Sequence, residues 1–289
     1  GDAHSTGVAT ATLPEALDVL WTASVDEGIE STAAIWQGTV YVGGLDGQLY
    51  AFELDTGDLK WTYQANVEIK SSPLIYDGTV FFGDGDGFFH AVDAQTGKKV
   101  WMFQAEGEVI ASANVDRGRI IFGSYDQFLY CLNAKDGALL WQLETDGYVH
   151  GMSAVTTEGA LVAGCDGMMR VVNVESGKEV SQTQLNDYVG ASVAVQNGRA
   201  FVGTYGNQVL CIDLEASEIV WRYEHPKRKF PYYASPAVTE THVIVAGRDK
   251  MVHALNPEDG TVLWTYVSRS RFESSPVVVG ERVFVGTTG

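Results

Sequence analysis

Short runs of hydrophobic residues alternate with polar turns along the whole chain. The clearest example is SSPLIYDGTVFFGDGDGFFHAVDAQTGKKVWMF at 71–103, where LIY, TVFFG, FFHAV and KKVWMF are separated by Asp-Gly or Thr-Gly pairs. Apolar runs of this length, bounded by glycine-containing turns, predict β-strands. No segment combines ten or more residues with the 3.6-residue periodicity of a helix. We therefore expect an all-β chain.

The strand pattern repeats about every 40 residues. Four strands in each repeat of this length are typical of a β-propeller blade. The repeat is marked by one aromatic position, which is occupied in turn by Trp21, Trp61, Trp101, Trp141, Ser181, Trp221 and Trp264.

Six full repeats and two partial ones account for the chain. A seventh repeat begins at 274–286 and stops after two strands, while GVATATLPEALDVLW at 7–21 matches the span of 47–61, with Ala11 and Trp21 at the positions of Ala51 and Trp61. We expect residues 8–23 to supply the third and fourth strands of the last blade, over 8–13 and 17–23, which removes its exposed edge. Residues 1–289 are then predicted to be a single domain, a seven-bladed β-propeller of four-stranded antiparallel blades whose last blade is closed by N- and C-terminal strands. Its blades are expected at about 31–64, 71–104, 111–144, 151–184, 191–224, 234–267, and 274–286 plus 8–23.

The repeat itself resembles that of the PQQ-type (pyrroloquinoline quinone-like) propellers, DGxLYAxDxxTGxxxW. The matching copies are DGQLYAFELDTGDLKW, DGFFHAVDAQTGKKVW and, more loosely, DKMVHALNPEDGTVLW. In that family the Trp docks over a neighbouring turn, and a small residue ten positions earlier leaves room for it. The resemblance therefore implies that Cys131 and Cys211, at that small position, are core residues. The chain departs from the pattern at Val171, at Ser181 and at Ala216–Ser217.

Composition narrows the classes of function. The chain has 289 residues, is 45% hydrophobic and has a formal net charge of -18. An acidic surface argues against nucleic-acid binding, because phosphate contact requires a basic face. No apolar run approaches the length of a membrane span. The start GDAHST, without Met, indicates a removed targeting segment or a fragment, and is compatible with a lipid anchor upstream.

One stretch runs against the acidic composition. HPKRKFPYY at 225–233 connects the fourth strand of one blade to the first strand of the next, and it is three residues longer than the equivalent connections. Residues 222–271 contain eight basic and five acidic side chains, whereas the remainder contains 11 and 32. Because Arg and Tyr carry much of the energy of interfaces, we expect a partner-binding face on blades six and seven; a solvated loop is the alternative. Its residues are Lys227, Arg228, Lys229, Phe230, Tyr233, Arg248, Lys250, Arg269 and Arg271.

No residue pattern indicates catalysis or a cofactor. GDGDG at 83–87 looks like part of a calcium loop but lacks the downstream bidentate Glu, so an Asp-Gly turn accounts for it. Three cysteines without CxxC spacing indicate neither a disulfide framework nor a zinc site, and there is no GxSxG nucleophile elbow. We expect no metal, no cofactor, no catalytic residues and no enzymatic activity. Polar residues that begin the first strands are expected at one mouth of the channel, as solvated groups or as a small-ligand site: Glu30, Lys70, His150 and Glu273.

The resemblance also implies a class of function. Quinoprotein dehydrogenases of the family have eight blades, a calcium ion, a catalytic Asp and usually an adjacent Cys-Cys pair, which this chain does not match. The BamB-like, non-enzymatic branch instead holds partner proteins. We therefore expect a protein-binding scaffold, acting in envelope protein assembly in a periplasmic or membrane-anchored location, with a protein or anionic ligand as partner. The alternative is a ligand-sensing propeller of a larger receptor or kinase, and a quinoprotein dehydrogenase is less favoured.

Overall fold

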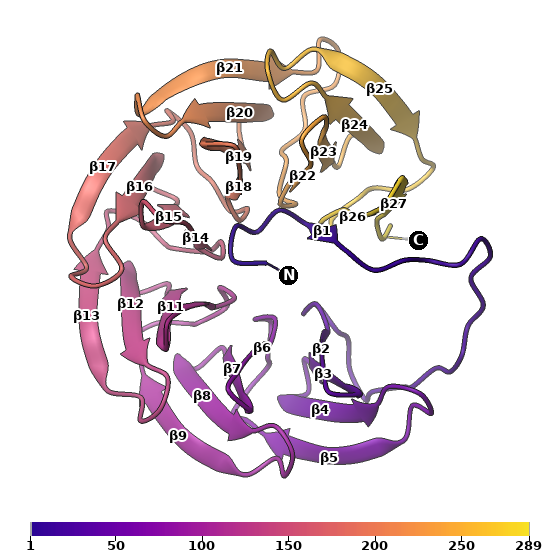
Figure 1. Ribbon diagram of the computed structural model, residues 1–289, viewed down its shortest axis with the longest axis vertical. Helices are drawn as coiled ribbons and strands as arrows, with labels where there is room; N and C mark the ends of the chain where they lie inside the picture. The colour runs from indigo at the N-terminus through magenta and orange to yellow at the C-terminus, as the bar shows by residue number, and fades with distance from the viewer. Residues whose placement is uncertain (1, 289) are drawn as a thin grey trace. The chain divides into compact units, whose positions relative to one another are not determined.

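The computed structural model describes residues 2–288, and these residues form 27 strands and no helix. The chain divides into two compact units, one of residues Ala16–Val149 and the other of Gly1–Glu15 with His150–Gly289. Each unit is built from consecutive sheets whose strands follow one another in chain order (Figure 1).

The unit of residues 16–149 contains three antiparallel sheets of four strands. The first sheet comprises β2 (Ala34–Trp36), β3 (Thr39–Gly43), β4 (Gln48–Glu53) and β5 (Leu59–Gln64). The second comprises β6 (Leu74–Tyr76), β7 (Thr79–Gly83), β8 (Phe88–Asp93) and β9 (Lys99–Gln104). The third comprises β10 (Asn114–Asp116), β11 (Arg119–Gly123), β12 (Phe128–Asn133) and β13 (Leu139–Glu144).

The other unit contains three sheets of four strands and one of three. The four-stranded sheets are β14 (Ala154–Val155), β15 (Ala160–Ala163), β16 (Met168–Val172) and β17 (Glu179–Gln184); β18 (Ala194–Gln196), β19 (Arg199–Gly203), β20 (Gln208–Asp213) and β21 (Glu218–Glu224); and β22 (Ala237–Val238), β23 (Val243–Ala246), β24 (Met251–Leu255) and β25 (Val262–Val267). The last sheet has the order β1 (Val8–Ala9), β26 (Val277–Val279), β27 (Arg282–Phe284).

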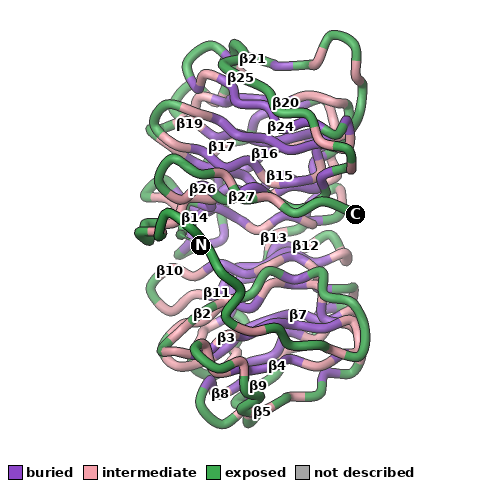
Figure 2. The backbone as a smooth tube through the Cα atoms, turned by 90° about the vertical axis from the view of Figure 1, so that its right-hand side faces the viewer, coloured by how far each residue is buried: buried purple, intermediate pink, exposed green. Residues whose placement is uncertain are grey.

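The seven consecutive sheets are the blades of a seven-bladed β-propeller, as the sequence predicts. Tight turns join the first two strands of several blades: Gln37–Gly38 has φ values of 45° and 71°, and Asp77–Gly78 has 48° and 75°. Two successive positive φ values define the type I′ turn, whose twist matches that of the flanking strands. In the four-stranded sheets the middle strands are the most buried (Figure 2). Most outer strands keep one face in solvent, whereas all six residues of β25 are exposed.

Several of the repeated tryptophans dock onto a turn of the following blade. The Trp61 indole donates to the carbonyl oxygen of Ala94 at 3.2 Å, and a Cβ added to Gly97 would lie 2.7 Å from its ring. The same docking joins Trp101 to Gly137 and Trp221 to Gly260. Glycine is required at these turns because φ is positive and the indole covers the space of a side chain. The small residues predicted beside the indoles lie directly opposite them on the third strand, as Cys131 does to Trp141.

The departures at Ser181 and Ser217 prove to be one feature. Ser217 occupies the turn position that is Gly97 or Gly137 in other blades, with a φ of 55°. The residue that would cover this turn is Ser181 rather than Trp, and instead Thr183 Oγ1 donates to the carbonyl oxygen of Ser217 at 3.0 Å. Where no indole arrives, a side chain can be accommodated, so the two departures compensate each other.

The prediction for the last blade is right about which termini meet and wrong about how. Val8–Ala9 pairs in parallel with β26, beside the first strand of the blade, and residues 17–23 form no strand. Trp21 nevertheless docks as the repeat predicts, donating to the carbonyl oxygen of Leu54 at 2.7 Å and covering Gly57. LPEAL contains no hairpin turn signal, and backbone hydrogen bonds of the preceding residues hold the segment on the first strands instead.

The carbonyl oxygens that accept these hydrogen bonds belong to residues 3–7, which we call the N-terminal strap. The strap passes the first strands of four successive sheets, β14, β18, β22 and β26 (Figure 1). Gly7 has a φ of 66°, and a Cβ there would lie 2.9 Å from the Cβ of Ala237, so only glycine fits. No pattern in the sequence indicates the strap.

Candidate partner-binding site

The basic connection between β21 and β22 begins with a turn built on His225. Its Nδ1 accepts hydrogen bonds from the backbone N–H groups of Lys227 (3.3 Å) and Arg228 (3.0 Å). Burial lowers the pKa of His225, and the neighbouring His253 lowers it further. The imidazole is therefore neutral near pH 7 and able to accept, which orders the start of the connection.

Arg228 ties this connection to the turn between β23 and β24. Its Nη1 donates to the carbonyl oxygen of Asp249 at 2.6 Å, and the side chain is partly buried. Beneath this contact, Asp249 Oδ2 lies 2.8 Å from His253 Nε2. Arg228 is thus an anchor of the loop, and its charge is less available to a partner than the sequence suggests.

Arg248 and Tyr233, predicted from separate segments, lie together. The guanidinium carbon of Arg248 is 4.3 Å from the centre of the Tyr233 ring, a distance typical of cation–π contact. Arg248 Nε is 2.9 Å from Glu273 Oε1 as an ion pair, although its N–H lacks a hydrogen-bond geometry toward any acceptor. The Tyr205 ring meets Tyr233 edge-on at 4.7 Å. Glu273, predicted at the channel mouth, thus belongs to this cluster.

The remaining basic residues differ in how free their charges are. Lys229 Nζ lies 3.3 Å from Glu224 Oε1. Within residues 2–288, no carboxylate lies at ion-pair distance from Lys227, Lys250, Arg269 or Arg271, and all four are exposed. Phe230, in the same connection as Lys227, is 45% exposed. We name these four basic side chains with Phe230 the open basic face.

The other residues predicted at the channel mouth fall in both units. Lys70 Nζ lies 3.1 Å from Glu68 Oε1, and this contact raises the pKa of Lys70, with Glu108 and Glu30 adding to the effect. Burial lowers the pKa of His150. Each unit therefore has polar groups at the start of its first strands. The group is a Lys paired with a Glu in one unit and a His with a lowered pKa in the other.

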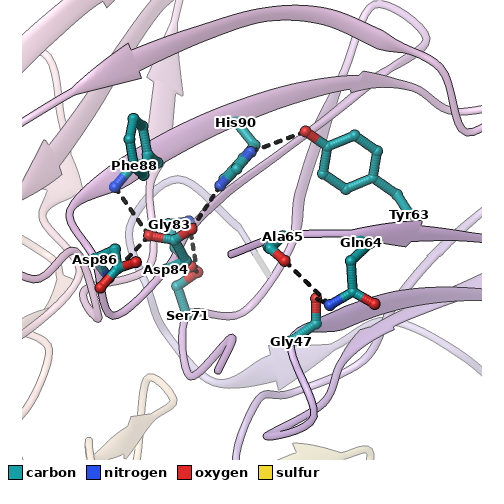
Figure 3. Close-up of polar contacts among 10 residues, drawn as sticks. All are labelled: Gly47, Tyr63, Gln64, Ala65, Ser71, Gly83, Asp84, Asp86, Phe88 and His90. Carbon is teal, nitrogen blue, oxygen red and sulfur yellow. Dashed lines mark hydrogen bonds and ion pairs between the residues drawn. The ribbon is translucent and has the colours of Figure 1, made fainter. Parts of the chain in front are cut away.

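Two buried Asp–His–Tyr networks were missed by the sequence analysis. His90 Nε2 lies 2.9 Å from Asp84 Oδ2, and its Nδ1 lies 3.1 Å from the Tyr63 hydroxyl (Figure 3). His253 makes the equivalent contacts with Asp249 and Tyr223. The signal was a polar residue in the middle of an apolar third strand.

These networks brace loops and do not form a catalytic centre. His90 is 1% exposed and Asp84 is fully buried, so no substrate reaches them. Asp84 Oδ1 also accepts from the N–H groups of Asp86 and Phe88, which closes the GDGDG loop as a turn. Each imidazole is occupied by an Asp and a Tyr, which leaves no partner for a nucleophilic serine.

The described residues offer no metal centre either. Across 2–288, no three His, Cys, Asp or Glu side chains converge as potential metal ligands. Cys131 and Cys211 are buried, and burial raises the pKa of each to about 12, as expected of core thiols. None of the described residues forms a helix long and apolar enough to cross a membrane.

Comparison with known proteins matches this architecture. The family model described as "Beta-alanine-activating enzyme, beta-propeller" matches residues 2–288. The chain belongs to this family. The crystal structure of BamB from Moraxella catarrhalis is similar, with a TM-score of 0.80 and 17% identity over 93% of this chain and 83% of that chain. This similarity confirms the predicted BamB-like fold. Curated protein sequences give no significant match.

Proposed function

We propose that this protein is a non-enzymatic scaffold whose open basic face binds an acidic segment of a partner protein. The observation that carries the proposal is that three separate segments bring Lys227, Lys250, Arg269 and Arg271 to one unit, where no carboxylate of residues 2–288 pairs with them. The rest of the chain is strongly acidic, with a net charge of -18 overall, so this concentration of unpaired positive charge is local to one region. Free charges that sum on one face steer the encounter with an oppositely charged partner.

The ordered surroundings support a binding surface over a solvated loop. Arg228 anchors the connection to the Asp249 carbonyl, and Arg248 is held between Tyr233 and Glu273. Contacts that restrain a connection in this way reduce the entropy lost on binding. Phe230 adds an exposed aromatic group, a residue type that is enriched at interfaces.

The comparisons are compatible with this proposal at different levels. The similarity to BamB, at 17% identity, supports the fold. From the BamB-like branch of the PQQ-type propellers we take the proposal of a scaffold in the periplasm or at a membrane. The family description contains the word enzyme together with β-propeller. We take the propeller to be a binding module, since the imidazoles best placed for chemistry, His90 and His253, are buried and fully engaged.

Charge reversal tests the proposal. The variant Lys227→Glu, Lys250→Glu, Arg269→Glu, Arg271→Glu should bind a fluorescein-labelled Asp/Glu-rich decapeptide at least about ten-fold more weakly, mostly through slower association. Raising the salt concentration should produce part of the same loss in the unsubstituted protein, because exposed charges are screened. Arg228 is left unchanged because it anchors the loop.

A matched control separates the face from net charge. Lys98, Lys99, Lys135 and Lys178 are also exposed, and reversing these four to Glu changes the net charge equally. This control variant should bind the peptide with nearly unchanged association rate. If both variants lose binding to the same extent, or neither does, the basic face is only a solvated loop.

A further inference from the structure

The N-terminal strap shows how the first strands of this protein bind an extended polypeptide. Four carbonyl oxygens of the strap each accept one backbone hydrogen bond, at 2.6–2.9 Å, and each bond comes from the first strand of a different sheet. The donor and acceptor pairs are Val155 with Ala3, Val195 with His4, Val238 with Thr6 and Val278 with Gly7. The strap is in effect a ligand that the chain supplies to itself.

The equivalent residues of the other unit have the same geometry. Each donor faces the residue five positions later in the second strand: Val155 faces Ala160, and likewise Ile35 faces Val40 and Ile75 faces Val80. Because hydrogen-bonded and non-bonded pairs alternate along an antiparallel ladder, the same register turns the N–H groups of Ile35 and Ile75 away from their neighbours in β3 and β7. The donors therefore point out of the sheet edge.

The first-strand edges of the two units differ in whether these N–H donors have an acceptor. Val155, Val195 and Val238 are buried, whereas Ile35 is 61% exposed and Ile75 is partly exposed. In the third sheet of the unit, the N–H of Val115 donates to the Asn114 side-chain oxygen at 2.8 Å, which caps it locally. Of the described residues, none accepts from the N–H groups of Ile35 and Ile75.

We propose that the first-strand edges of β2 and β6 are a second binding surface, which takes an extended segment of a partner polypeptide by one backbone hydrogen bond per sheet. The occupant is inferred from the strap, whose residues apart from the exposed His4 are small, so that the backbone approaches the edge closely. Addition of an extended peptide to an unpaired strand edge is a general mode of recognition. This surface is distinct from the open basic face and goes beyond the proposed function.

The charges beside these edges define the partner further. Glu30, Glu68 and Glu108 precede the first strands of the three sheets, and Lys70 Nζ lies 3.1 Å from Glu68 Oε1. Three carboxylates against one ammonium leave the approach negative. The segment should therefore carry a Lys, an Arg or a free α-amine in addition to its small residues.

Hydrogen exchange of the unsubstituted protein tests the proposal directly. The probes are the peptides acetyl-DAHSTGVA-amide and acetyl-KAHSTGVA-amide, added in increasing concentration. At saturation, the exchange of the Ile35 and Ile75 amides, followed residue by residue by NMR, should slow at least about ten-fold. The Val115 amide, already bonded to Asn114, is the internal control and should not change. The lysine peptide should bind more tightly.

Proline variants test the donors themselves. Ile35→Pro with Ile75→Pro removes both N–H groups and should weaken binding by about five-fold for each bond, whereas Ile35→Val with Ile75→Val retains both donors and should bind normally. Thermal unfolding checks that the variants fold. If the proline variant is unfolded, the hydrogen-exchange experiment on the unsubstituted protein decides the proposal. Unchanged exchange at Ile35 and Ile75, or equal slowing at Val115, would overturn the proposal. Peptide binding should survive reversal of the open basic face, so the two proposals can fail separately.

Discussion

The two units of the chain are built from one repeat, yet their first strands end in different surroundings. In the unit of residues 150–289, four first strands donate to the strap, and Val155, Val195 and Val238 are buried beneath it. In the unit of residues 16–149, Ile35 at the same register is 61% exposed. The repeat therefore sets the direction of each edge donor, while a distant segment determines whether that donor forms a hydrogen bond.

The outer edges show the opposite contrast. In residues 16–149 the docking of Trp onto Gly is uniform, with Trp21, Trp61 and Trp101 covering Gly57, Gly97 and Gly137. In the other unit it is interrupted at Ser181 and Ser217. The unit of residues 16–149 thus has the more regular outer edge, and it is also the unit whose first-strand edges have no strap.

Removal of the strap should have the largest effect. A chain beginning at Val8 loses four backbone hydrogen bonds. At about 1 kcal/mol each, its free energy of unfolding should fall by about 4 kcal/mol, and the Val155, Val195 and Val238 amides should exchange like that of Ile35. Guanidinium unfolding and hydrogen exchange measure both.

The matched control for the strap is His4→Ala. This side chain is exposed, and the bond to Val195 uses the backbone carbonyl, so stability should change by less than about 0.5 kcal/mol. If removal of the strap changes the free energy of unfolding as little as the control does, the hydrogen bonds between the strap and the first strands do not stabilise the protein.

Substitution at the Trp-covered turns should have the next largest effect. Gly97→Ala puts a Cβ at 2.7 Å from the Trp61 ring with φ at 68°, and should cost about 2–4 kcal/mol from strain and displaced packing. Ser217→Ala changes the equivalent turn, which already holds a side chain at a φ of 55°, and should cost less than about 0.5 kcal/mol. Equal losses in urea unfolding would mean that the indole does not dictate glycine.

The pH dependence of stability should give the smallest effect. Because burial lowers the pKa of His150, the unfolded chain binds a proton more readily, and stability should fall as the pH drops below the ordinary histidine value of about 6.5. His150→Gln should therefore reduce the loss in melting temperature between pH 8 and pH 5.5.

Lys70, at the equivalent position of the other unit, should behave differently. Glu68 raises its pKa, so its contribution is fully present below about pH 10.4 and is lost only above that value. In the Lys70→Met variant, the change in melting temperature between pH 8 and pH 5.5 should be the same as in the unsubstituted protein. An identical pH response of both variants would contradict this contrast.

The candidate site was predictable in composition and not in geometry. The clustered charges of 225–233 are visible in the sequence, because blade topology brings Arg248 and Lys250 to the same end of the sheets. The sequence could not show that Arg228 donates to the Asp249 carbonyl oxygen or that Arg248 forms an ion pair with Glu273. Such pairings depend on side-chain conformations that neighbouring strands select.

The repeat in the sequence was enough to predict the number of blades and the Asp-Gly turns such as Asp77–Gly78. These features depend on residues at short or regular spacings, where turn chemistry and side-chain volume leave few alternatives. Only the tertiary structure decided that residues 3–7 form a strap and that Val8–Ala9 pairs beside the first strand of the last blade. The physical reason is that backbone N–H and carbonyl groups are the same in every residue, so the sequence does not show which distant segment will pair with an open edge.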